Sequence, residues 1–188
     1  MVETEKIKYV YLLGIGGIGM SALARYFSFA GKQVSGYDKT PSPLTDELIA
    51  EGIPVHFNED LTISPKLEER EDTLVIFTPA VPEHFGELKW LRANSFTIAK
   101  RSEVLGSLSR NKNCIAVAGT HGKTSVTTMT AYLLRESHID CIAFMGGLSR
   151  NYGTNLLLPA NNSKVMVAEA DEFDRSFLRL FPEMAVIT

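Results

Sequence analysis

One short segment of the sequence, VAGTHGKTS, carries residue types that could bind a nucleoside triphosphate. Gly119 and Gly122 allow backbone N–H groups to approach phosphate oxygens closely. Lys123 can neutralise the β- and γ-phosphates, and the Thr124 hydroxyl can bind Mg²⁺. The segment departs from the pattern G-x-x-x-x-G-K-[ST], because Val117 stands where the first glycine should be. We expect nucleotide binding here; the alternative is a glycine-rich turn with an incidental lysine.

A second glycine-rich segment, GIGGIG, could bind a diphosphate. Gly14, Gly16 and Gly19 form the pattern G-x-G-x-x-G, and Asp38 follows about 20 residues later, where a ribose-binding acid is expected. The glycines allow close backbone approach, and the following helix offers free N–H groups and the positive end of its dipole. A nucleotide-sugar diphosphate presents the same oxygens as NAD, so the ligand stays open. The alternative is a glycine turn that only packs a helix tightly on a strand.

Four carboxylates follow the apolar run KVMVA, and they could bind a metal ion or begin a helix. They are Glu169, Asp171, Glu172 and Asp174. An acid at the end of a strand beside the P-loop strand can hold Mg²⁺ at the γ-phosphate, and we assign that role to Glu169. For the other three we prefer acids at a helix N-terminus, where they face the positive end of the dipole.

The elements that must position these residues alternate between short apolar, β-rich runs and longer segments of helical period. Strands are expected within residues 7–13, 33–38, 73–78, 96–99, 113–119, 141–147, 164–170 and 183–188. Helices are expected at 18–30, 44–51, 83–94, 101–110 and 122–136. This alternation predicts an α/β fold: a Rossmann-like parallel-sheet domain over residues 1–107, then a P-loop α/β domain over 108–188. The polar stretch GSLSRNKN marks the expected boundary.

Composition excludes several classes of protein. The net charge is −3 and neither sign is concentrated in a long run, so the sequence does not suggest a nucleic-acid-binding surface. No segment approaches the roughly 20 apolar residues that span a bilayer, and the N-terminus lacks the pattern of a signal peptide. We therefore expect a cytoplasmic protein without membrane insertion. Cys114 and Cys141 have no C-x-x-C partner and are expected to be core residues.

Several motifs together resemble those of the Mur ligases of bacterial cell-wall synthesis. They are GIGGIGMSALA, VSGYD, GTHGKT, the GG at 146–147, the GTN at 153–155 and AEADEFDRSFL, and the resemblance covers essentially the whole chain. It implies a UDP-binding domain, a central ATPase domain and a C-terminal domain that brings the amino acid. The sequence ends on the apolar run AVIT, so we expect a truncated second domain, no amino-acid domain and no turnover by the piece alone; a true terminus at an edge strand is the alternative.

The activity implied by the resemblance is ATP-driven amide formation. ATP and Mg²⁺ would convert the carboxylate of UDP-N-acetylmuramate into an acyl phosphate, which the amine of L-alanine attacks. His121 within GTHGKT favours the alanine-adding branch of the family or its close relatives; the alternative is that His121 only braces the loop. The product would serve peptidoglycan synthesis.

The resemblance also implies roles for individual residues. Lys123 would neutralise charge on the transferred phosphoryl group, Thr124 would bind the first Mg²⁺, and Glu169 would bind a metal between ATP and the carboxylate. The expected ATP-binding residues are Gly119, Thr120, His121, Gly122, Lys123, Thr124 and Ser125. The expected substrate-binding residues are Gly14, Gly16, Gly17, Ile18, Gly19, Asp38, Arg101 and Asn155. For Arg101, closing the domain boundary is an equal alternative, and His56 is assigned no role.

Three other functions stay open. The first is a recycling ligase, which attaches a ready-made tripeptide to the same muramic acid nucleotide and shares GTHGKT. The second is an NAD-dependent dehydrogenase domain over the first 105 residues, which the glycine pattern permits. The third is a non-catalytic regulator in which Lys123 and Thr124 hold ATP as a switch.

Overall fold

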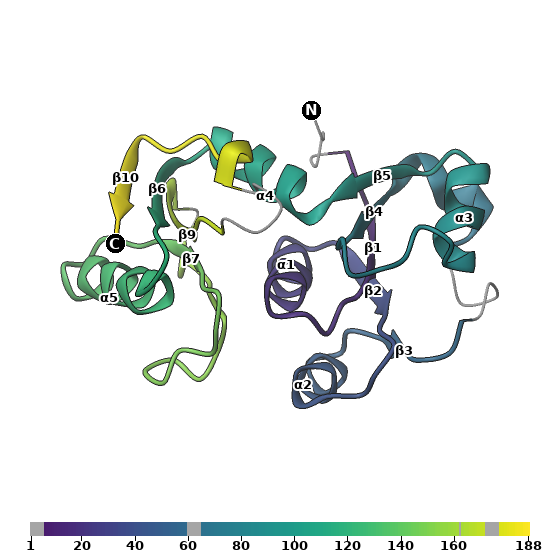
Figure 1. Ribbon diagram of the computed structural model, residues 1–188, viewed down its shortest axis with the longest axis horizontal. Coiled ribbons are helices and arrows are strands. Elements are labelled where there is room, and N and C mark those ends of the chain that lie inside the picture. Colours follow the sequence, from purple (N-terminus) through teal and green to yellow (C-terminus); the bar gives the residue numbers. More distant parts are fainter. Residues whose placement is uncertain (1–5, 60–64, 162, 172–176) are drawn as a thin grey trace. The chain divides into compact units, whose positions relative to one another are not determined.

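The computed structural model describes residues 6–59, 65–161, 163–171 and 177–188. The chain divides after Arg101 into two compact units, called here the N-terminal unit (Val2–Arg101) and the C-terminal unit (Ser102–Thr188). Each unit is built around a five-stranded sheet (Figure 1). Two successive α/β sheets confirm the expected fold class.

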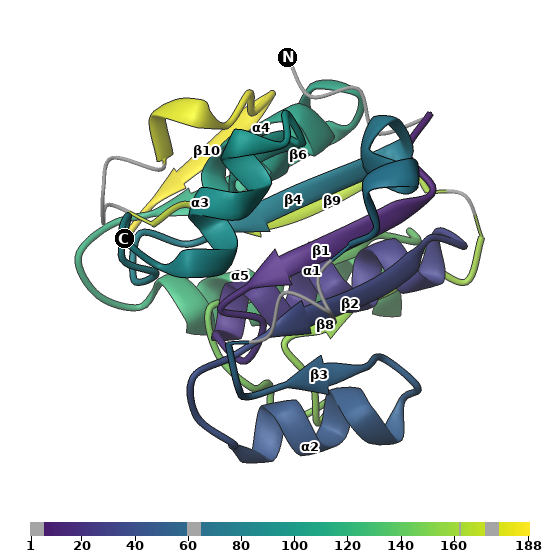
Figure 2. The same cartoon turned by 90° about the vertical axis from the view of Figure 1, so that its right-hand side faces the viewer.

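The N-terminal unit alternates strands and helices along the sequence. Its strands are β1 (Tyr9–Leu13), β2 (Gln33–Tyr37), β3 (Val55–His56), β4 (Thr73–Phe77) and β5 (Thr97–Lys100). Its helices are α1 (Ile18–Phe29), α2 (Pro43–Ala50), α3 (Gly86–Ala93) and the 3-10 helix η1 (Leu67–Asp72). The strands are parallel in the order β3-β2-β1-β4-β5, and Figure 2 shows β3, β2, β1 and β4 side by side. The sheet grows to both sides of β1, which places its topological switch point at the carboxyl end of that strand.

Helices cover both faces of the N-terminal sheet. On one face, Tyr11 and Leu13 of β1 pack in a buried cluster with Leu88 and Leu91 of α3. Figure 1 shows α1 on the opposite face of the same strands. Leu12, which alternates with these residues along β1, is also fully buried. A strand buried on both faces requires the continuous apolar run YVYLL, as is typical of parallel sheets.

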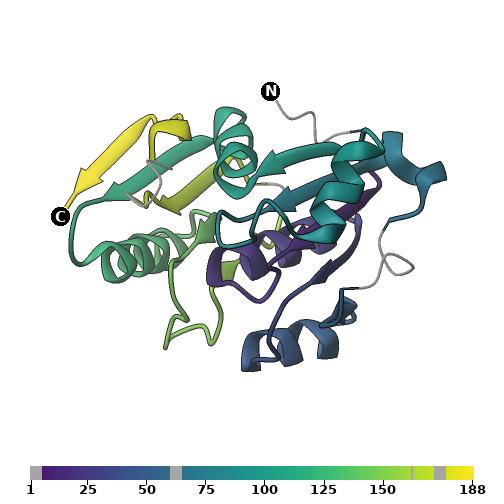
Figure 3. The same cartoon turned by 45° about the vertical axis from the view of Figure 1, so that its right-hand side comes forward.

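The C-terminal unit contains the second sheet. Its strands are β6 (Asn113–Ala118), β7 (Ile142–Phe144), β8 (Leu156–Leu157), β9 (Val165–Glu169) and β10 (Met184–Ile187). Helix α4 (Arg101–Arg110) precedes them, and α5 (Lys123–Glu136) follows β6. The order is β10-β6-β9-β7-β8, antiparallel only between β7 and β8; Figure 3 shows β10 (yellow) beside β6 (teal).

Helix α5 packs on the central strands of this second sheet. Ala131 of α5 forms a buried cluster with Cys141, Ala143 and Val167. Cys114 on β6 is also buried and both thiols are free, which confirms the prediction that the cysteines are core residues. With 14 residues, α5 is the longest helix in the described ranges, and none of the helices there is long and apolar enough to cross a bilayer.

The expected boundary region proves to be partly structured. The division predicted after residue 107 falls inside α4, whereas the compact units divide after Arg101. Gly106 is buried, and a Cβ there would lie 2.3 Å from the carbonyl oxygen of Arg179. The hydroxyl of Ser109 accepts a hydrogen bond of 3.0 Å from the N–H of Phe181. Small and polar residues in GSLSRNKN therefore pack closely against the backbone, where sequence reasoning expected few core contacts.

Candidate functional site

The glycine turn between β1 and α1 is held by the backbone of the neighbouring strand. The N–H groups of Gly14 and Ile15 donate to the carbonyl of Tyr37 at 2.8 and 3.0 Å, which ties the turn to the end of β2. Gly14 has a φ of +84°, and a Cβ there would lie 2.7 Å from Thr78 Cγ2. Backbone conformation and space therefore both select glycine at this position.

The turn leads into a helix N-terminus that no described side chain caps. Gly17, with extended backbone, is the N-cap of α1, and no side-chain hydrogen bond caps it there. The first N–H groups of a helix have no intrahelical partner and form the positive end of its dipole. The predicted diphosphate residues lie together in this turn or in the first turn of α1: Gly14, Gly16, Gly17, Ile18 and Gly19. This arrangement can bind an anion through backbone groups.

Asp38 lies directly on the glycine turn, just after β2. Its carboxylate accepts hydrogen bonds from the N–H groups of Gly16 at 2.8 Å and Thr40 at 3.1 Å. A Cβ on Gly16 would lie 2.9 Å from Asp38 Oδ2. The acid therefore orders the turn, a contact that the sequence did not predict; its proposed role toward uridine stays a prediction.

Arg101 brings positive charge to the other side of the turn. It follows β5 at the carboxyl edge of the sheet, and its side chain lies against Gly19 in the first turn of α1. A Cβ on Gly19 would lie 2.7 Å from Arg101 Nη1 and 3.1 Å from its Cδ. The two ends of the turn thus differ in charge, with Asp38 at one and Arg101 at the other. This polarity suits a ligand that has hydroxyl groups at one end and phosphates at the other.

The second glycine loop, between β6 and α5, has the geometry of a phosphate-binding loop. Gly119 and Gly122 have φ values of +132° and +82°, which L side chains rarely adopt. Gly122 is the N-cap of α5, and no side-chain hydrogen bond from the described residues caps it. Lys123 is the first residue of the helix, and its Nζ donates to the carbonyl of Gly119 at 2.7 Å. The ammonium group therefore lies over the loop whose backbone N–H groups would bind phosphate.

Glu169, at the end of β9, and Thr124, in the first turn of α5, both lie next to the glycine pair at 146–147. Glu169 ends β9, beside β6, and its carboxylate accepts a hydrogen bond of 2.8 Å from the N–H of Gly146. A Cβ on Gly146 would collide with that carboxylate at 2.5 Å, and a Cβ on Gly147 would lie 3.4 Å from Thr124 Cγ2. The GG pair at 146–147 thus lies next to both residues, with the Glu169 carboxylate against Gly146 and the Thr124 methyl group near Gly147.

This donor set fits Mg²⁺ bound together with a nucleotide. Among the residues that the structure describes, no three His, Cys, Asp or Glu side chains gather in a way that could hold a metal ion. Mg²⁺ does not need such a cage, because it usually binds one or two carboxylates together with phosphate oxygens and waters. Glu169 and Thr124 supply that kind of partial shell, and their roles as metal ligands stay predictions.

The remaining predicted residues are distributed around these two loops. Thr120, His121 and Ser125 are exposed in or next to the second loop. Asn155 is fully buried, its carbonyl accepting a hydrogen bond of 3.0 Å from the N–H of Met145, and its contact with substrate stays a prediction. Asp171 is described and half-buried, whereas Glu172 and Asp174 lie outside the described residues.

Sequence reasoning missed one residue at the second loop, Thr188. Its N–H and hydroxyl contact the carbonyls of Ala118 and His121. A threonine at the end of an apolar run carries no signal of its own. Only the sheet order, which places β10 next to β6, brings it to the loop.

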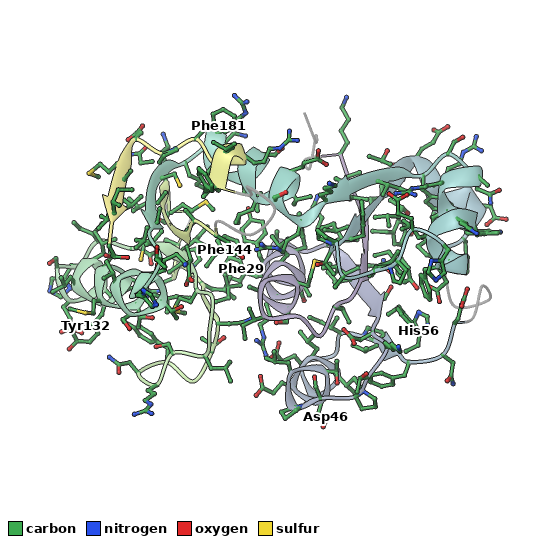
Figure 4. All side chains as sticks on the ribbon, in the orientation of Figure 1. Phe29, Asp46, His56, Tyr132, Phe144 and Phe181 are labelled. Atoms are coloured by element: carbon green, nitrogen blue, oxygen red, sulfur yellow. The ribbon has the colours of Figure 1, made fainter. Side chains whose placement is uncertain are left out.

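A hollow of about 430 Å³ extends from the second loop along α5. Its polar end is formed by Thr124 and Ser125, and its apolar part includes Met129 and Tyr132. Figure 4 labels Tyr132 on α5. Loop residues 148–151 form the opposite wall. The hollow is therefore contiguous with the candidate nucleotide site.

Comparison with known proteins shows which family the chain resembles. A family model described as "Mur ligase family, catalytic domain" matches residues 9–113. The chain is similar to UDP-N-acetylmuramate–L-alanine ligase of Porphyromonas gingivalis, with 55% identity over 183 residues, which are 97% of this chain and 40% of that protein. The corresponding ligase of Phocaeicola vulgatus is 53% identical over 188 residues, 100% of this chain and 41% of its own. The chain thus spans about 40% of the length of these curated relatives.

Solved structures of two ligases share the fold. UDP-N-acetylmuramate-alanine ligase from Thermotoga maritima aligns with a TM-score of 0.84 and 31% identity, over 95% of this chain and 40% of that chain. UDP-N-acetylmuramate:L-alanyl-gamma-D-glutamyl-meso-diaminopimelate ligase from Neisseria meningitides aligns with the same TM-score and 26% identity, over 96% and 60%. Structural likeness alone therefore does not separate the two activities that these names describe.

Proposed function

The chain belongs to the Mur ligase family, and from this premise we propose that the full-length protein joins L-alanine to UDP-N-acetylmuramate, with ATP as the energy source, in peptidoglycan synthesis. In this proposal the N-terminal unit binds the UDP part of the substrate, and the C-terminal unit binds ATP. The observation that carries the proposal is the position of Lys123, Thr124 and Glu169 around one phosphate-binding loop at the carboxyl edge of a parallel sheet. The curated relatives that are 55% and 53% identical are named as UDP-N-acetylmuramate–L-alanine ligases, and these names support L-alanine and UDP-N-acetylmuramate as the substrates.

The reaction would proceed by phosphoryl transfer followed by amide formation. A carboxylate oxygen of UDP-N-acetylmuramate attacks the γ-phosphorus of ATP, and ADP leaves. The amine of L-alanine then attacks the acyl carbon, a proton leaves the nitrogen, and phosphate departs. Activating the carboxylate in this way converts a poor leaving group into a good one, and the protein contributes mainly position and charge neutralisation.

The residues of the C-terminal unit would act on the phosphates. The ammonium of Lys123, now 2.7 Å from the carbonyl of Gly119, lies where it can turn to the β- and γ-phosphate oxygens. Thr124 and Glu169 would hold Mg²⁺, which when bound neutralises charge on the transferred phosphoryl group. Glu169 already accepts the N–H of Gly146, so one carboxylate oxygen is oriented by the fold.

The N-terminal unit would anchor the nucleotide of the acceptor substrate. The glycine turn and the N-terminus of α1 offer backbone N–H groups to the diphosphate, and Arg101 offers a guanidinium against Gly19. Asp38 lies at the opposite end of the turn and would face the uridine hydroxyls. Because ATP and a nucleotide sugar are the expected substrates, the expected location of the reaction is the cytoplasm.

The recycling activity is the second candidate, since the Neisseria ligase shares the fold with a TM-score of 0.84. It is less well supported, because this chain is 55% identical to a curated L-alanine ligase and 26% identical to that structure. The full-length protein should therefore release phosphate from ATP with UDP-N-acetylmuramate and L-alanine. It should not do so when the tripeptide replaces L-alanine. The reverse preference would overturn the assignment.

A calorimetric titration tests the N-terminal unit separately. We expect the titration with UDP-N-acetylmuramate to show binding. The titration with NADH, at matched salt and Mg²⁺, should show no heat of binding. Binding of NADH alone would assign the glycine turn to a dinucleotide and reject its proposed ligand. The P-loop would then still be tested by the phosphate-release assay.

A further inference from the structure

Thr188 lies on the nucleotide loop because of the register of two strands. β10 runs parallel to β6, with Val186 opposite Val117 and Ile187 opposite Ala118. The next residue, Thr188, therefore reaches the point where β6 ends and the loop begins. Its N–H donates to the carbonyl of Ala118 at 2.9 Å, which extends the pairing by one residue.

The side chain of Thr188 contacts the loop in two places. Its Oγ1 lies 2.5 Å from the carbonyl oxygen of His121 and 3.2 Å from that of Ala118. Both carbonyls can only accept, so the single hydroxyl proton is donated to the nearer His121 oxygen or shared with Ala118. Gly119 and Thr120 lie between these two carbonyls in the sequence, so the Thr188 side chain contacts the backbone on both sides of this segment.

Thr188 occupies the space that a side chain at position 119 would need. A Cβ at Gly119 would lie 2.3 Å from the carbonyl oxygen of Thr188, 2.4 Å from its Oγ1 and 2.8 Å from its nitrogen. Two of these three atoms belong to the backbone, so a larger residue at position 119 would have to displace the end of β10. The loop and the strand end thus fit each other closely.

These contacts orient the peptide groups of the loop. In a trans peptide the C=O and the N–H point in opposite directions. Thr188 donates its N–H to the carbonyl of Ala118, and its hydroxyl contacts the carbonyls of Ala118 and His121. The N–H groups that follow these two carbonyls, those of Gly119 and Gly122, therefore point away from Thr188. That is the polarity that a bound phosphate requires, since a carbonyl turned toward it would repel it.

We propose that Thr188 is a positioning residue for nucleotide binding, which acts through the loop by holding the carbonyls of Ala118 and His121 away from the phosphates. The inference rests on the proposed function in taking MgATP as the ligand of this loop. It adds a residue that lies outside the glycine-rich motif and that contacts the loop from another strand. The hydroxyl, rather than the bulk of the side chain, carries the role.

Two substitutions separate the hydroxyl from the bulk. Thr188→Val keeps the shape and removes the donor, whereas Thr188→Ser keeps the donor and removes a methyl group. In the full-length protein we expect Thr188→Val to weaken MgATP binding about tenfold, the usual effect of losing one such hydrogen bond. Thr188→Ser should restore most of the affinity, and the KM for UDP-N-acetylmuramate should stay unchanged in both variants.

Hydrogen exchange gives a readout that does not depend on the ligand. The amides of residues 119–122 should exchange faster in Thr188→Val than in Thr188→Ser, with no difference in α5 beyond its first turn. Equal exchange and equal MgATP affinity in the two variants would overturn the proposal. If the unsubstituted protein did not bind MgATP, the proposed function of the loop would fail, while the exchange comparison would still decide whether Thr188 holds the loop.

Discussion

Tyr11 Oη on β1 and Glu87 Oε2 on α3 lie 2.5 Å apart, and both side chains are almost completely buried. The same Tyr11 oxygen lies 2.7 Å from Nε2 of His56, which Figure 4 labels. Tyrosine has one hydroxyl proton, so two hydrogen bonds at this oxygen require a second proton, on His56 Nε2 or on the Glu87 carboxyl. The three side chains therefore depend on one another inside the N-terminal unit.

Tyr11→Phe should destabilise the N-terminal unit. It leaves the buried Glu87 carboxylate without this donor, and such a loss typically costs about 1–3 kcal/mol. Urea unfolding measures the change in the free energy of unfolding. Tyr9→Phe, on the same strand but only half-buried, is the control and should change it by less. Equal effects of the two substitutions would mean that the Tyr11 hydroxyl contributes nothing specific.

Arg101→Gln should weaken the binding of UDP-N-acetylmuramate and leave the fold intact. The guanidinium lies against Gly19 at the N-terminus of α1, and charge-assisted bonds to phosphate are about twice as strong as neutral ones. We expect a loss of about tenfold or more in affinity by calorimetry. Arg92→Gln is the matched control, because that guanidinium lies over the ring of Phe77, 5.7 Å from its centroid. An unchanged affinity in Arg101→Gln would leave this residue only its alternative role at the domain boundary.

Lys123→Ala and Glu169→Gln should separate two functions of the nucleotide site. The lysine change removes the ammonium that contacts the loop, so MgATP affinity should fall. The glutamine can still accept a hydrogen bond from the N–H of Gly146, so the fold should be kept. Because it carries no charge, the Mg²⁺ concentration needed for half-maximal phosphate release should rise. Phosphate release at varied Mg²⁺ measures both. An unchanged MgATP affinity in Lys123→Ala would reject the assignment of the loop.

The buried thiols predict how stability depends on pH. Burial, with a smaller effect of Glu183, raises the pKa of Cys114 from 9.0 to about 11. Burial also raises the pKa of Cys141. The pKa of each thiol is higher in the folded state than in the unfolded state. The contribution of the neutral thiol to the free energy of unfolding is therefore fully present below pH 9 and is lost as the pH rises toward 11. For Cys114 the loss would reach about 2–3 kcal/mol.

The check is thermal unfolding between pH 8 and pH 10.5, together with thiol alkylation. Native Cys114 should react slowly, because little thiolate is exposed. Cys114→Ala should show a shallower fall of Tm with pH than the unsubstituted protein. Parallel curves would assign the alkaline loss of stability to other groups.

The sequence predicts the order of the long elements because their patterns are regular. The helices at 18–30 and 122–136 agree with α1 and α5 within a residue at each end. β3 and β8 were missed, since each has only two residues. Two residues are too few for any alternation to be recognised.

The candidate site was predictable where it depends on local spacing and not where it depends on sheet order. Glycine-rich turns after apolar runs identify both loops, as their positions confirm. The hydrogen bond that Asp38 accepts from the turn and the one that Thr188 donates to the P-loop can be predicted only when the neighbouring strands are known. Neither residue type, alone in its segment, indicates these partners.

The pairing of β10 with β6 has a consequence for synthesis of the protein. The loop at residues 119–122 is translated well before Thr188, yet its carbonyls find this donor only once β10 has been added to the sheet. On the ribosome, a nascent chain that has exposed GTHGKT but not AVIT would lack this restraint on the loop. Full affinity for nucleotide should then appear late in translation, when β10 emerges rather than the motif itself.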